Sequence, residues 1–457
     1  MKRAVSAVLS LALAGCYSMA PTYERPAAPI PKQLPGGQGA AGHLTLAQFV
    51  KEPKLRDVLA RVVGQNRTLR RTALDIESAR QLYRVQRAQF LPSVDLGANV
   101  TSTRALAGTP DNATVRFTSY GASVGLAAWE IDLFGRLKSL SDAKLQQYLS
   151  AVETAKATRI SLIAETATAW VTLAADRSRL AIAKETMATS QKAMELTEQL
   201  VGGGTSNRGD YWQASTVFQQ ARGDVATLTA AIAQDRNALE LLAGGPIEDA
   251  LLPQELPAQL DWFAEVPVGL GSEVLLDRPD VVAAEHDLMA ANANIGAARA
   301  QFFPSLTLTA SGGLASVALA SLFTGPAAVF TIAPALALPL FRGGANRANL
   351  AYTEAQKQSF VAAYELAIQT AFREVSDALA TRATIDEALA AQTALVDASQ
   401  KAFELSEARY KAGIDTFLTT LVTQRTLYAA KSSLVATQLA ALGNRVTLYR
   451  VLGGGLD

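Results

Sequence analysis

Side chains that could do covalent or metal chemistry are scarce in this sequence of 457 residues. Cys16 is the only cysteine, so no disulfide can form within one chain. The only histidines, His43 and His286, are far apart in the sequence. Zinc sites of the Cys/His type and His-dependent catalytic triads are therefore poorly supplied. We expect no metal site and no cofactor other than a covalent lipid, described below.

Three carboxylates, Asp277, Asp280 and Glu285, are the best candidates for acid–base catalysis. No pocket-forming context isolates an acid–base pair among them, and their segment is better interpreted as a repeat boundary followed by a helix start. We therefore expect no enzyme, although an enzyme of envelope metabolism remains an alternative. The chain has 42 basic and 41 acidic residues, a net charge of +1. This balance argues against nucleic acid as a partner.

The N-terminus carries a targeting signal. Lys2 and Arg3 precede an apolar run, and Leu13-Ala14-Gly15-Cys16 follows it. These four residues resemble the bacterial lipobox, in which the cysteine is acylated and becomes the new N-terminus. The alternative is an ordinary signal peptide with an incidental cysteine. We predict a lipoprotein signal peptide over residues 1–15, a lipid on Cys16, and an extended proline-rich strap over 16–45.

The chain contains an internal repeat. Three motifs recur in the same order at nearly one spacing, 207 to 212 positions. They are Ala88–Ser93 with Ala300–Ser305, Leu133–Arg136 with Leu340–Gly343, and Leu241–Gly245 with Val451–Gly455. We assign repeat 1 to residues 46–245, a connector or equatorial region to 246–278, and repeat 2 to 279–457. Each repeat is predicted to hold a helix, a β-hairpin (91–130 and 304–340) and a long helical hairpin (136–243 and 346–452).

Both predicted β-hairpins show a period of two, apolar residues alternating with small or polar ones. In the first, Tyr120, Ala122, Val124, Leu126 and Ala128 form the apolar series. This pattern is typical of a transmembrane barrel wall. Aromatic residues that would form girdles flank the strands: Phe90, Phe117, Trp129, Phe302, Phe303 and Phe341. A half-buried sheet in a soluble protein remains an alternative. A transmembrane helix over 300–341 is disfavoured by its prolines and glycines.

Four strands cannot close a barrel, so the barrel interpretation requires several chains to share one. The long helical stretches 136–200 and 346–410 show coiled-coil spacing and would each reach on the order of 100 Å. A helical wall around a lumen and a plain helical bundle both fit this spacing. Glycines end the first helix of each hairpin, and Asp210 and Asp415 lie where a carboxylate complements the dipole of the returning helix.

The whole mature chain resembles the TolC-like outer-membrane efflux factors, in the NodT/OprM-like lipoprotein branch of RND-type systems. Four segments carry the resemblance: Tyr23–Pro26, Leu275–Val281 with Ala284-Glu285, the doubled A-x-F-x-P-S, and Arg409–Asp415 followed by Gln424-Arg425. It implies a trimer with one shared antiparallel barrel of twelve strands, four from each chain, and a periplasmic α-helical barrel of coiled-coil hairpins. The implied partners are outer-membrane lipid, a periplasmic adaptor and an inner-membrane pump that supplies the energy.

The resemblance also implies a gate at the periplasmic tip. Tyr410 matches a tyrosine that helps to close it, and Asp415 matches an acidic position beyond the turn. Val422 stands where many members carry an acid, so we expect an apolar constriction here. The adaptor is expected to dock on the two turns, at Gly203, Gly204, Thr205, Gly413 and Ile414.

Two functions remain open from the sequence besides the enzyme. The first is a passive channel of a tripartite efflux system. The second is a lipid-anchored coiled-coil spacer of the envelope without a pore, which would have no need of four amphipathic strands in two equivalent places.

Overall fold

The computed structural model describes residues 18–35, 44–106, 114–204, 207–267, 271–323 and 325–455. Cys16, the predicted signal peptide and Thr205 lie outside these residues. The chain divides into two compact units. The sheet unit comprises Met1–Ala27, Asp75–Val152 and Ala283–Glu365, and the helical unit comprises Ala28–Leu74, Glu153–Val282 and Leu366–Asp457.

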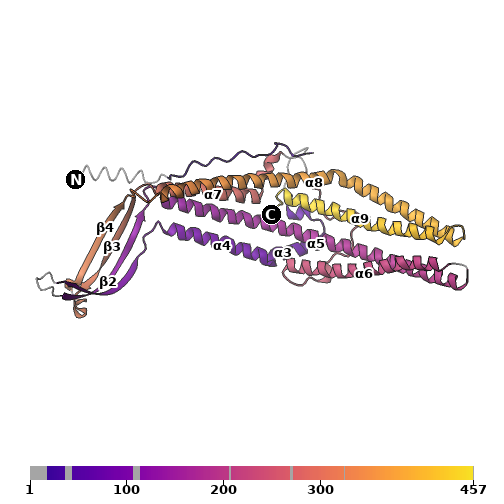
Figure 1. The fold of residues 1–457 in the computed structure, drawn as a ribbon, viewed down its shortest axis with the longest axis horizontal. Helices are drawn as coiled ribbons and strands as arrows, with labels where there is room; N and C mark the ends of the chain where they lie inside the picture. Colours follow the sequence, from indigo (N-terminus) through magenta and orange to yellow (C-terminus); the bar gives the residue numbers. More distant parts are fainter. Residues whose placement is uncertain are drawn as a thin grey trace. The chain divides into compact units, whose positions relative to one another are not determined.

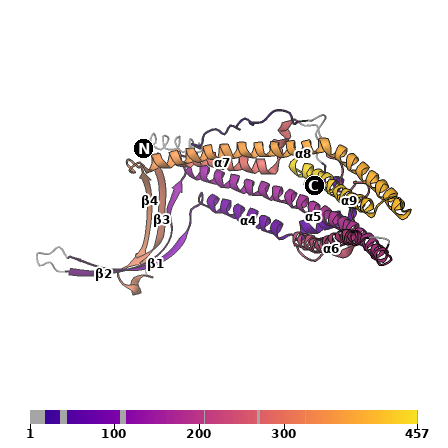
Figure 2. The same cartoon turned by 45° about the vertical axis from the view of Figure 1, so that its right-hand side comes forward.

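The sheet unit contains one antiparallel sheet of four strands in the order β1-β2-β3-β4 (Figures 1 and 2). The strands are β1 (Asp95–Leu106), β2 (Thr114–Ile131), β3 (Ser305–Ser316) and β4 (Ala328–Ala337), with short 3-10 turns at Leu319–Ser321 and Gly325–Ala327. Each repeat contributes one hairpin, and β2 pairs with β3 across the repeats. The strands of repeat 2 exclude a transmembrane helix over 300–341.

Helix α7 (Pro279–Ala300) meets the proline-rich strap within the sheet unit. The Asn292 side-chain amide donates to the Pro21 carbonyl at 2.7 Å. Gly296 permits this approach, because a Cβ there would lie 2.6 Å from the Ala20 nitrogen and 2.5 Å from the Ser139 hydroxyl. The strap therefore packs on α7 as extended backbone.

Two long helical hairpins make up most of the helical unit, and the first helix of each begins in the sheet unit (Figure 1). One joins α5 (Arg136–Gly202) to α6 (Arg208–Ala243), and the other joins α8 (Ala345–Lys411) to α9 (Phe417–Val451). Helix α5 has no proline, and its only glycine is its last residue, so nothing in its sequence interrupts the backbone hydrogen bonds. The remaining helices are α2 (Leu46–Phe49), α3 (Pro53–Gln65) and α4 (Arg67–Ala88), with 3-10 turns at Asp249–Leu251 and Ser272–Asp277.

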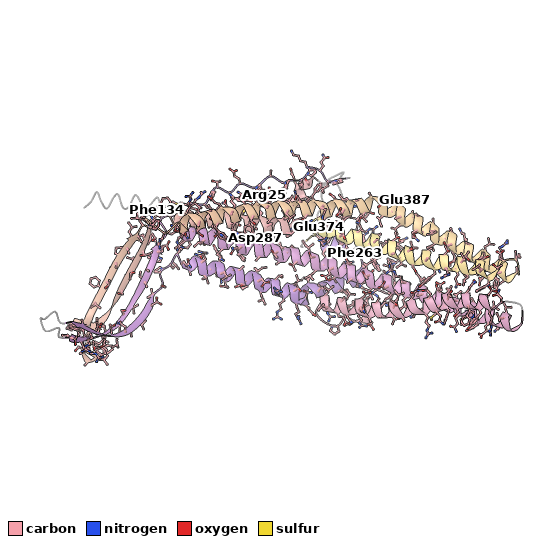
Figure 3. All side chains as sticks on the ribbon, viewed as in Figure 1. Arg25, Phe134, Phe263, Asp287, Glu374 and Glu387 are labelled. Atoms are coloured by element: carbon pink, nitrogen blue, oxygen red, sulfur yellow. The ribbon has the colours of Figure 1, made fainter. Side chains whose placement is uncertain are left out.

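Aromatic side chains fasten the connector to the helices of the helical unit. Phe49 stacks on Phe263 at 5.1 Å and on Tyr449 at 4.2 Å between ring centroids; Figure 3 labels Phe263. The Trp170 ring meets the edge of Trp262 at 4.7 Å, and its indole N–H donates to the Leu251 carbonyl. The connector, predicted from its prolines, is thus a packed part of this core.

Among the described residues, no helix combines the length and apolar character needed to cross a membrane.

Candidate functional site

One face of the sheet is apolar across all four strands. The register places Leu96 opposite Val124 on β1 and β2, Ala122 opposite Leu314 on β2 and β3, and Leu306 opposite Leu336 on β3 and β4. Because residues directly opposite each other point to the same side of a sheet, these side chains share one face. Leu96 is 81% exposed and Phe330, on the same face, is 83% exposed. Such an exposed apolar surface marks a contact with lipid or with another protein.

The opposite face carries small and polar residues. Gly125 lies opposite Ser311, and Ser123 lies opposite Gly313. A Cβ at Gly125 would come within 2.5 Å of the Ala310 carbonyl oxygen, so this position accepts only glycine without a shift of the neighbouring strand. Where all four strands pair, the two faces therefore have the chemistry predicted from the period of two, whereas nearer the β1–β2 turn Arg104 and Arg116 lie on the face of Leu96.

A β-bulge in β2 departs from the predicted alternation. The register shifts between Leu126 and Trp129, and Ala128 adopts a left-handed φ of 48°. The Ala128 N–H donates to the Thr309 hydroxyl at 3.1 Å, on the small face. The prediction that Ala128 belongs to the apolar series is wrong: the extra residue returns Trp129, opposite Leu308, to the apolar face. Phe117 and Trp129 lie inside β2 because this strand is longer than predicted. The register places Phe117, opposite Thr103, on the small face, so its predicted place in an aromatic girdle on the apolar face is wrong.

The tips of the helical hairpins form the second candidate site. Ala214, Val217, Phe417 and Leu421 make a buried cluster, against which Tyr410 packs. The Tyr410 and Phe417 ring centroids are 5.4 Å apart. Burial, and then the charge of Asp210, raises the pKa of the Tyr410 hydroxyl. Tyr410 thus lies at the point where the α8–α9 hairpin contacts α6.

A groove of about 750 Å³ opens beside this cluster. Its lining includes Leu196, Leu200, Asn207, Asp210, Tyr410 and Phe417, from both hairpins. Of the predicted docking residues, Gly204 and Gly413 line it, both with positive φ, whereas Gly203 precedes Gly204 in the turn after α5 and does not line the groove. Ile414 is exposed. The groove therefore combines apolar walls with a carboxylate at the end of the hairpins.

Asp415 does not cap helix α9. Its carboxylate accepts two hydrogen bonds from the Arg409 guanidinium, at 2.7 and 3.0 Å, and this ion pair lowers the pKa of the Asp415 carboxyl. Thr416 precedes α9, and no side chain caps that helix. The predicted dipole role of Asp415 gives way to a bidentate clamp across the α8–α9 turn. Val422 is 54% exposed, on the second turn of α9.

Two motifs of the predicted repeat boundary hold distant segments together through hydrogen bonds and ion pairs. Arg278 is buried, donates to the Val451 carbonyl at 2.8 Å, and pairs with Asp280 and with Glu374 of α8, which Figure 3 labels. In repeat 1, the Asn66 side chain donates in the same way to the Leu242 carbonyl at 2.8 Å. Each bond holds the end of a returning helix, although its donor lies more than 170 positions away.

The second fastening joins two segments that carry the family resemblance. Glu285 of α7 accepts hydrogen bonds from the Tyr23 hydroxyl at 3.0 Å and from the Nε–H and Nη2–H groups of Arg25; Figure 3 labels Arg25. The Glu285 carboxylate is buried, and burial with its charge raises the pKa of Tyr23. Glu285 and Asp280 thus serve as ion-pair partners. No metal-binding group of three or more ligands occurs within the described ranges.

Comparisons with known proteins agree with this geometry. The family model "Outer membrane efflux protein" matches residues 58–245 and 270–454, one match in each repeat. The solvent efflux pump outer membrane protein SrpC of Pseudomonas putida is 42% identical over 97% of this chain and 96% of its own. The outer membrane protein OprJ of Pseudomonas aeruginosa is 40% identical, covering 99% and 96%.

Solved structures give the same result. A membrane protein from Pseudomonas aeruginosa superposes with a TM-score of 0.88 at 39% identity, covering 96% of this chain and 98% of that one. The open state of the Neisseria gonorrhoeae MtrE outer membrane channel superposes with a TM-score of 0.84 at 36% identity, covering 96% and 99%. The predicted fold class, a four-stranded contribution to a β-barrel with long helical hairpins, is confirmed, and the pore-free spacer is not favoured. This chain belongs to the outer membrane efflux protein family.

Proposed function

We propose that three copies of this chain form one outer-membrane channel, with a shared barrel of twelve strands above a periplasmic tunnel of helical hairpins. The carrying observation is the apolar face that continues across all four strands, with Leu96 and Phe330 exposed on it. Burying such side chains in lipid contributes about 25 cal/mol per Å² of apolar area. The small and polar face would then line the pore.

The edges of the sheet support the requirement for several chains. Within the described residues, β1 and β4 each pair on one side only. Unpaired backbone groups are not tolerated in the hydrocarbon region, so both edges need partner strands. Three copies supply twelve strands and leave no edge.

Conduction is passive in this proposal, and an inner-membrane pump of the RND type supplies the energy. A periplasmic adaptor docks on the turns at Gly203, Gly204, Thr205, Gly413 and Ile414. The groove of about 750 Å³ with its apolar walls and the exposed Ile414 and Trp212 support a docking surface at this end. The acyl chains on Cys16 would anchor the strap in the outer membrane.

The gate is proposed at Tyr410, Asp415 and Val422. Tyr410 packs at the contact between the hairpins, and the Arg409–Asp415 clamp fixes the adjoining turn. Val422 presents an exposed apolar side chain where an acid would make a charged ring. Three such valines would form a constriction that closes by dewetting.

Planar-bilayer recordings of purified protein test the channel. We expect discrete conductance steps from the wild type and, from Val422→Asp, a larger leak with a preference for cations. Val422→Leu serves as the matched apolar control and should keep the closed state. Unchanged leak and selectivity in Val422→Asp would place the constriction elsewhere. Silence of the wild type, in recordings and in liposome swelling, would favour a spacer without a pore.

The cargo is proposed to be small apolar organic molecules, because SrpC is named for solvent efflux at 42% identity. A bacterial strain without its own channel of this family, complemented with this chain, should regain tolerance to an organic solvent such as toluene. Tolerance equal to that of the empty-vector strain would contradict this cargo class.

A further inference from the structure

The junction between the two repeats inside the chain is held by a ring stack, and an ion pair within repeat 1 lies at the same cavity. Arg136 donates to both carboxylate oxygens of Glu130, at 2.8 and 2.6 Å. Phe134, labelled in Figure 3, stacks on Phe303 at 4.9 Å between centroids. On the neighbouring strand, Thr307 lies opposite Glu130. Strand β2 of repeat 1 is thus fastened beside β3 of repeat 2.

The internal repeat places the same elements at the two free edges of the sheet. Aligning Ala88–Ser93 with Ala300–Ser305 makes Leu91 the counterpart of Phe303, and Asp95 the counterpart of Thr307. Aligning the two Leu-Phe motifs makes Phe341 the counterpart of Phe134, and Ala337 the counterpart of Glu130. Strand β4 therefore has the same relation to a following β1 that β2 has to β3.

The two junctions differ in which strand carries the acidic residue. Where the first junction has glutamate opposite threonine, the second would have Ala337 opposite Asp95. Arg342, beside Phe341, has no acid at the position that Glu130 holds in repeat 1. It lines a cavity together with Glu130 and Asp132, but neither Arg342 nor Asp95 has an ion pair within the described part of the chain. Phe341 is 88% exposed. Arg342 lies five positions after the end of β4, which is one edge strand of the sheet, and Asp95 begins β1, the other edge strand.

We propose that Arg342 forms an ion pair with Asp95 of a neighbouring copy, rebuilding between chains the Glu130–Arg136 fastening found within one. In this arrangement β4 pairs with β1 of the neighbouring copy, and Ala337 lies opposite the Asp95 of that copy. Phe341 packs against Leu91 of that neighbouring copy. The inference rests on the proposed trimer and assigns its contacts.

The register agrees with the chemistry of both faces. It places Leu336 opposite Leu96 of the neighbouring copy, both on the apolar face, and Ala335 opposite Gly97, both on the small face. A slip of one residue would bring every apolar side chain of β4 beside the small face of β1. The faces therefore exclude the odd registers, and the repeat alignment selects one of the even ones.

Disulfide crosslinking tests this register. Directly opposed residues of antiparallel strands have Cα atoms about 4.5–5.5 Å apart, within the range a disulfide spans. In the full chain, Asp95→Cys combined with Ala337→Cys should give covalent trimers on a non-reducing gel after mild oxidation. The single variants control for Cys16, and Asp95→Cys with Ala333→Cys tests a register four residues away. A stronger crosslink in that second pair would overturn the proposed register.

Charge reversal tests the ion pair. Arg342→Asp and Asp95→Arg should each lower the temperature at which trimers dissociate in detergent, and the double variant should regain most of the loss. Arg347→Asp, an exposed residue of α8, is the matched control. If Arg342 instead binds a lipid phosphate, Arg342→Asp would lose stability equally with and without Asp95→Arg, and only in the presence of phospholipid.

Native mass spectrometry separates the two levels of the proposal. A monomeric protein in mild detergent would overturn the proposed trimer itself. A trimer that neither crosslinks at Asp95 and Ala337 nor shows charge rescue would overturn the assigned contacts and leave the trimer standing.

Discussion

Helices α4 and α7 occupy the same place in the two repeats, have 22 residues each, and have opposite surroundings. No residue of α4 is buried, and six of its residues are arginines. Helix α7 has one arginine and buries most of its length. The repeat alignment puts Arg84 of α4 at the position of Gly296, the glycine that admits the strap. One repeat is thus completed by the chain's own N-terminal strap, whereas α4 of the other repeat stays exposed and would be covered by a neighbouring copy in the proposed trimer.

The largest difference in stability between matched variants of the two repeats should appear where each returning helix ends. Arg278→Ala removes the bond to the Val451 carbonyl and leaves Glu374 with only a 3.7 Å contact to Arg450. Breaking a buried ion pair typically costs about 3 kcal/mol or more. Asn66→Ala removes a helix cap and the bond to the Leu242 carbonyl, at about 2 kcal/mol.

Denaturant unfolding followed by circular dichroism measures both losses. Arg278→Lys should recover only part of the stability, because a lysine cannot donate to three partners in a planar fork. Equal losses of stability in Arg278→Ala and Asn66→Ala would show that the ion pairs of Arg278 add nothing to the hydrogen bond that both repeats share.

The second test concerns a carboxyl group that only repeat 1 has. Burial, the charge of Asp176 and a hydrogen bond with it raise the pKa of Asp235 to about 6. The closing hydrogen bonds of α6 and α9 align Gly244 with Gly453, one position away from the alignment of the sequence motifs. This makes Asn444 the counterpart of Asp235, and Asn444 donates to the Ala378 carbonyl. Arg179 pairs with Asp176, and Glu165 and Arg450 line the groove that Asp235 shares.

Because the folded state holds this proton more tightly than the unfolded chain, its stabilising effect is complete below the ordinary aspartate pKa. It is lost as the pH rises through about 6. We expect Asp235→Asn to melt a few degrees above the wild type at pH 8 and to match it at pH 4. Asp397→Asn, at an exposed acid of α8, should show no such gap. A wild-type-minus-variant difference that is flat between pH 4 and 8 would mean that Asp235 titrates normally.

A smaller effect is expected where the strap meets α7. Glu285→Gln weakens the bonds from Tyr23 and Arg25, and half of the Arg25 side chain is exposed to water. We expect a loss of about 1 kcal/mol and faster amide hydrogen exchange confined to residues 18–27. Glu24→Gln removes the same charge from an exposed neighbour and should change neither quantity. Unchanged exchange in Glu285→Gln would mean that Asn292 and Gly296 suffice to hold the strap.

The sequence predicted the features that depend on neighbouring residues. The period of two located the strands, and the glycines located the ends of α5 and α8. The bulge at Ala128 is not predicted from the sequence. A bulge is an extra residue in β2 relative to β3, and the alternation within β2 carries no information about the strand it pairs with. The role of Arg278 was missed because the carbonyl that it binds lies 173 positions away. From the sequence Asp415 is assigned to a helix dipole, whereas Arg409, six positions earlier at the end of α8, binds the same carboxylate.

The smallest change in stability is expected at the turns, where the repeats use different fastenings. In repeat 1, the Asn207 side chain accepts from the Asp210 N–H at 3.0 Å, a local cap. In repeat 2, Arg409 clamps Asp415 across the turn, and both groups are open to solvent. Exposed ion pairs often contribute nothing measurable to stability. We therefore expect Arg409→Gln to melt as the wild type does.

The same substitution should still change conductance. An aspartate is ionised at neutral pH, and because Arg409 lowers the pKa of Asp415, the ion pair is lost only at a pH more acidic than the ordinary aspartate pKa. Arg409→Gln at pH 7 should then open as often as the wild type does in acid, whereas Asn207→Ala should leave the opening frequency unchanged. If both variants open alike, the two turns are equivalent and the gate does not depend on the clamp. If only Arg409→Gln opens more often than the wild type, the gate depends on the α8–α9 turn of repeat 2, the repeat whose helix α7 also binds the strap.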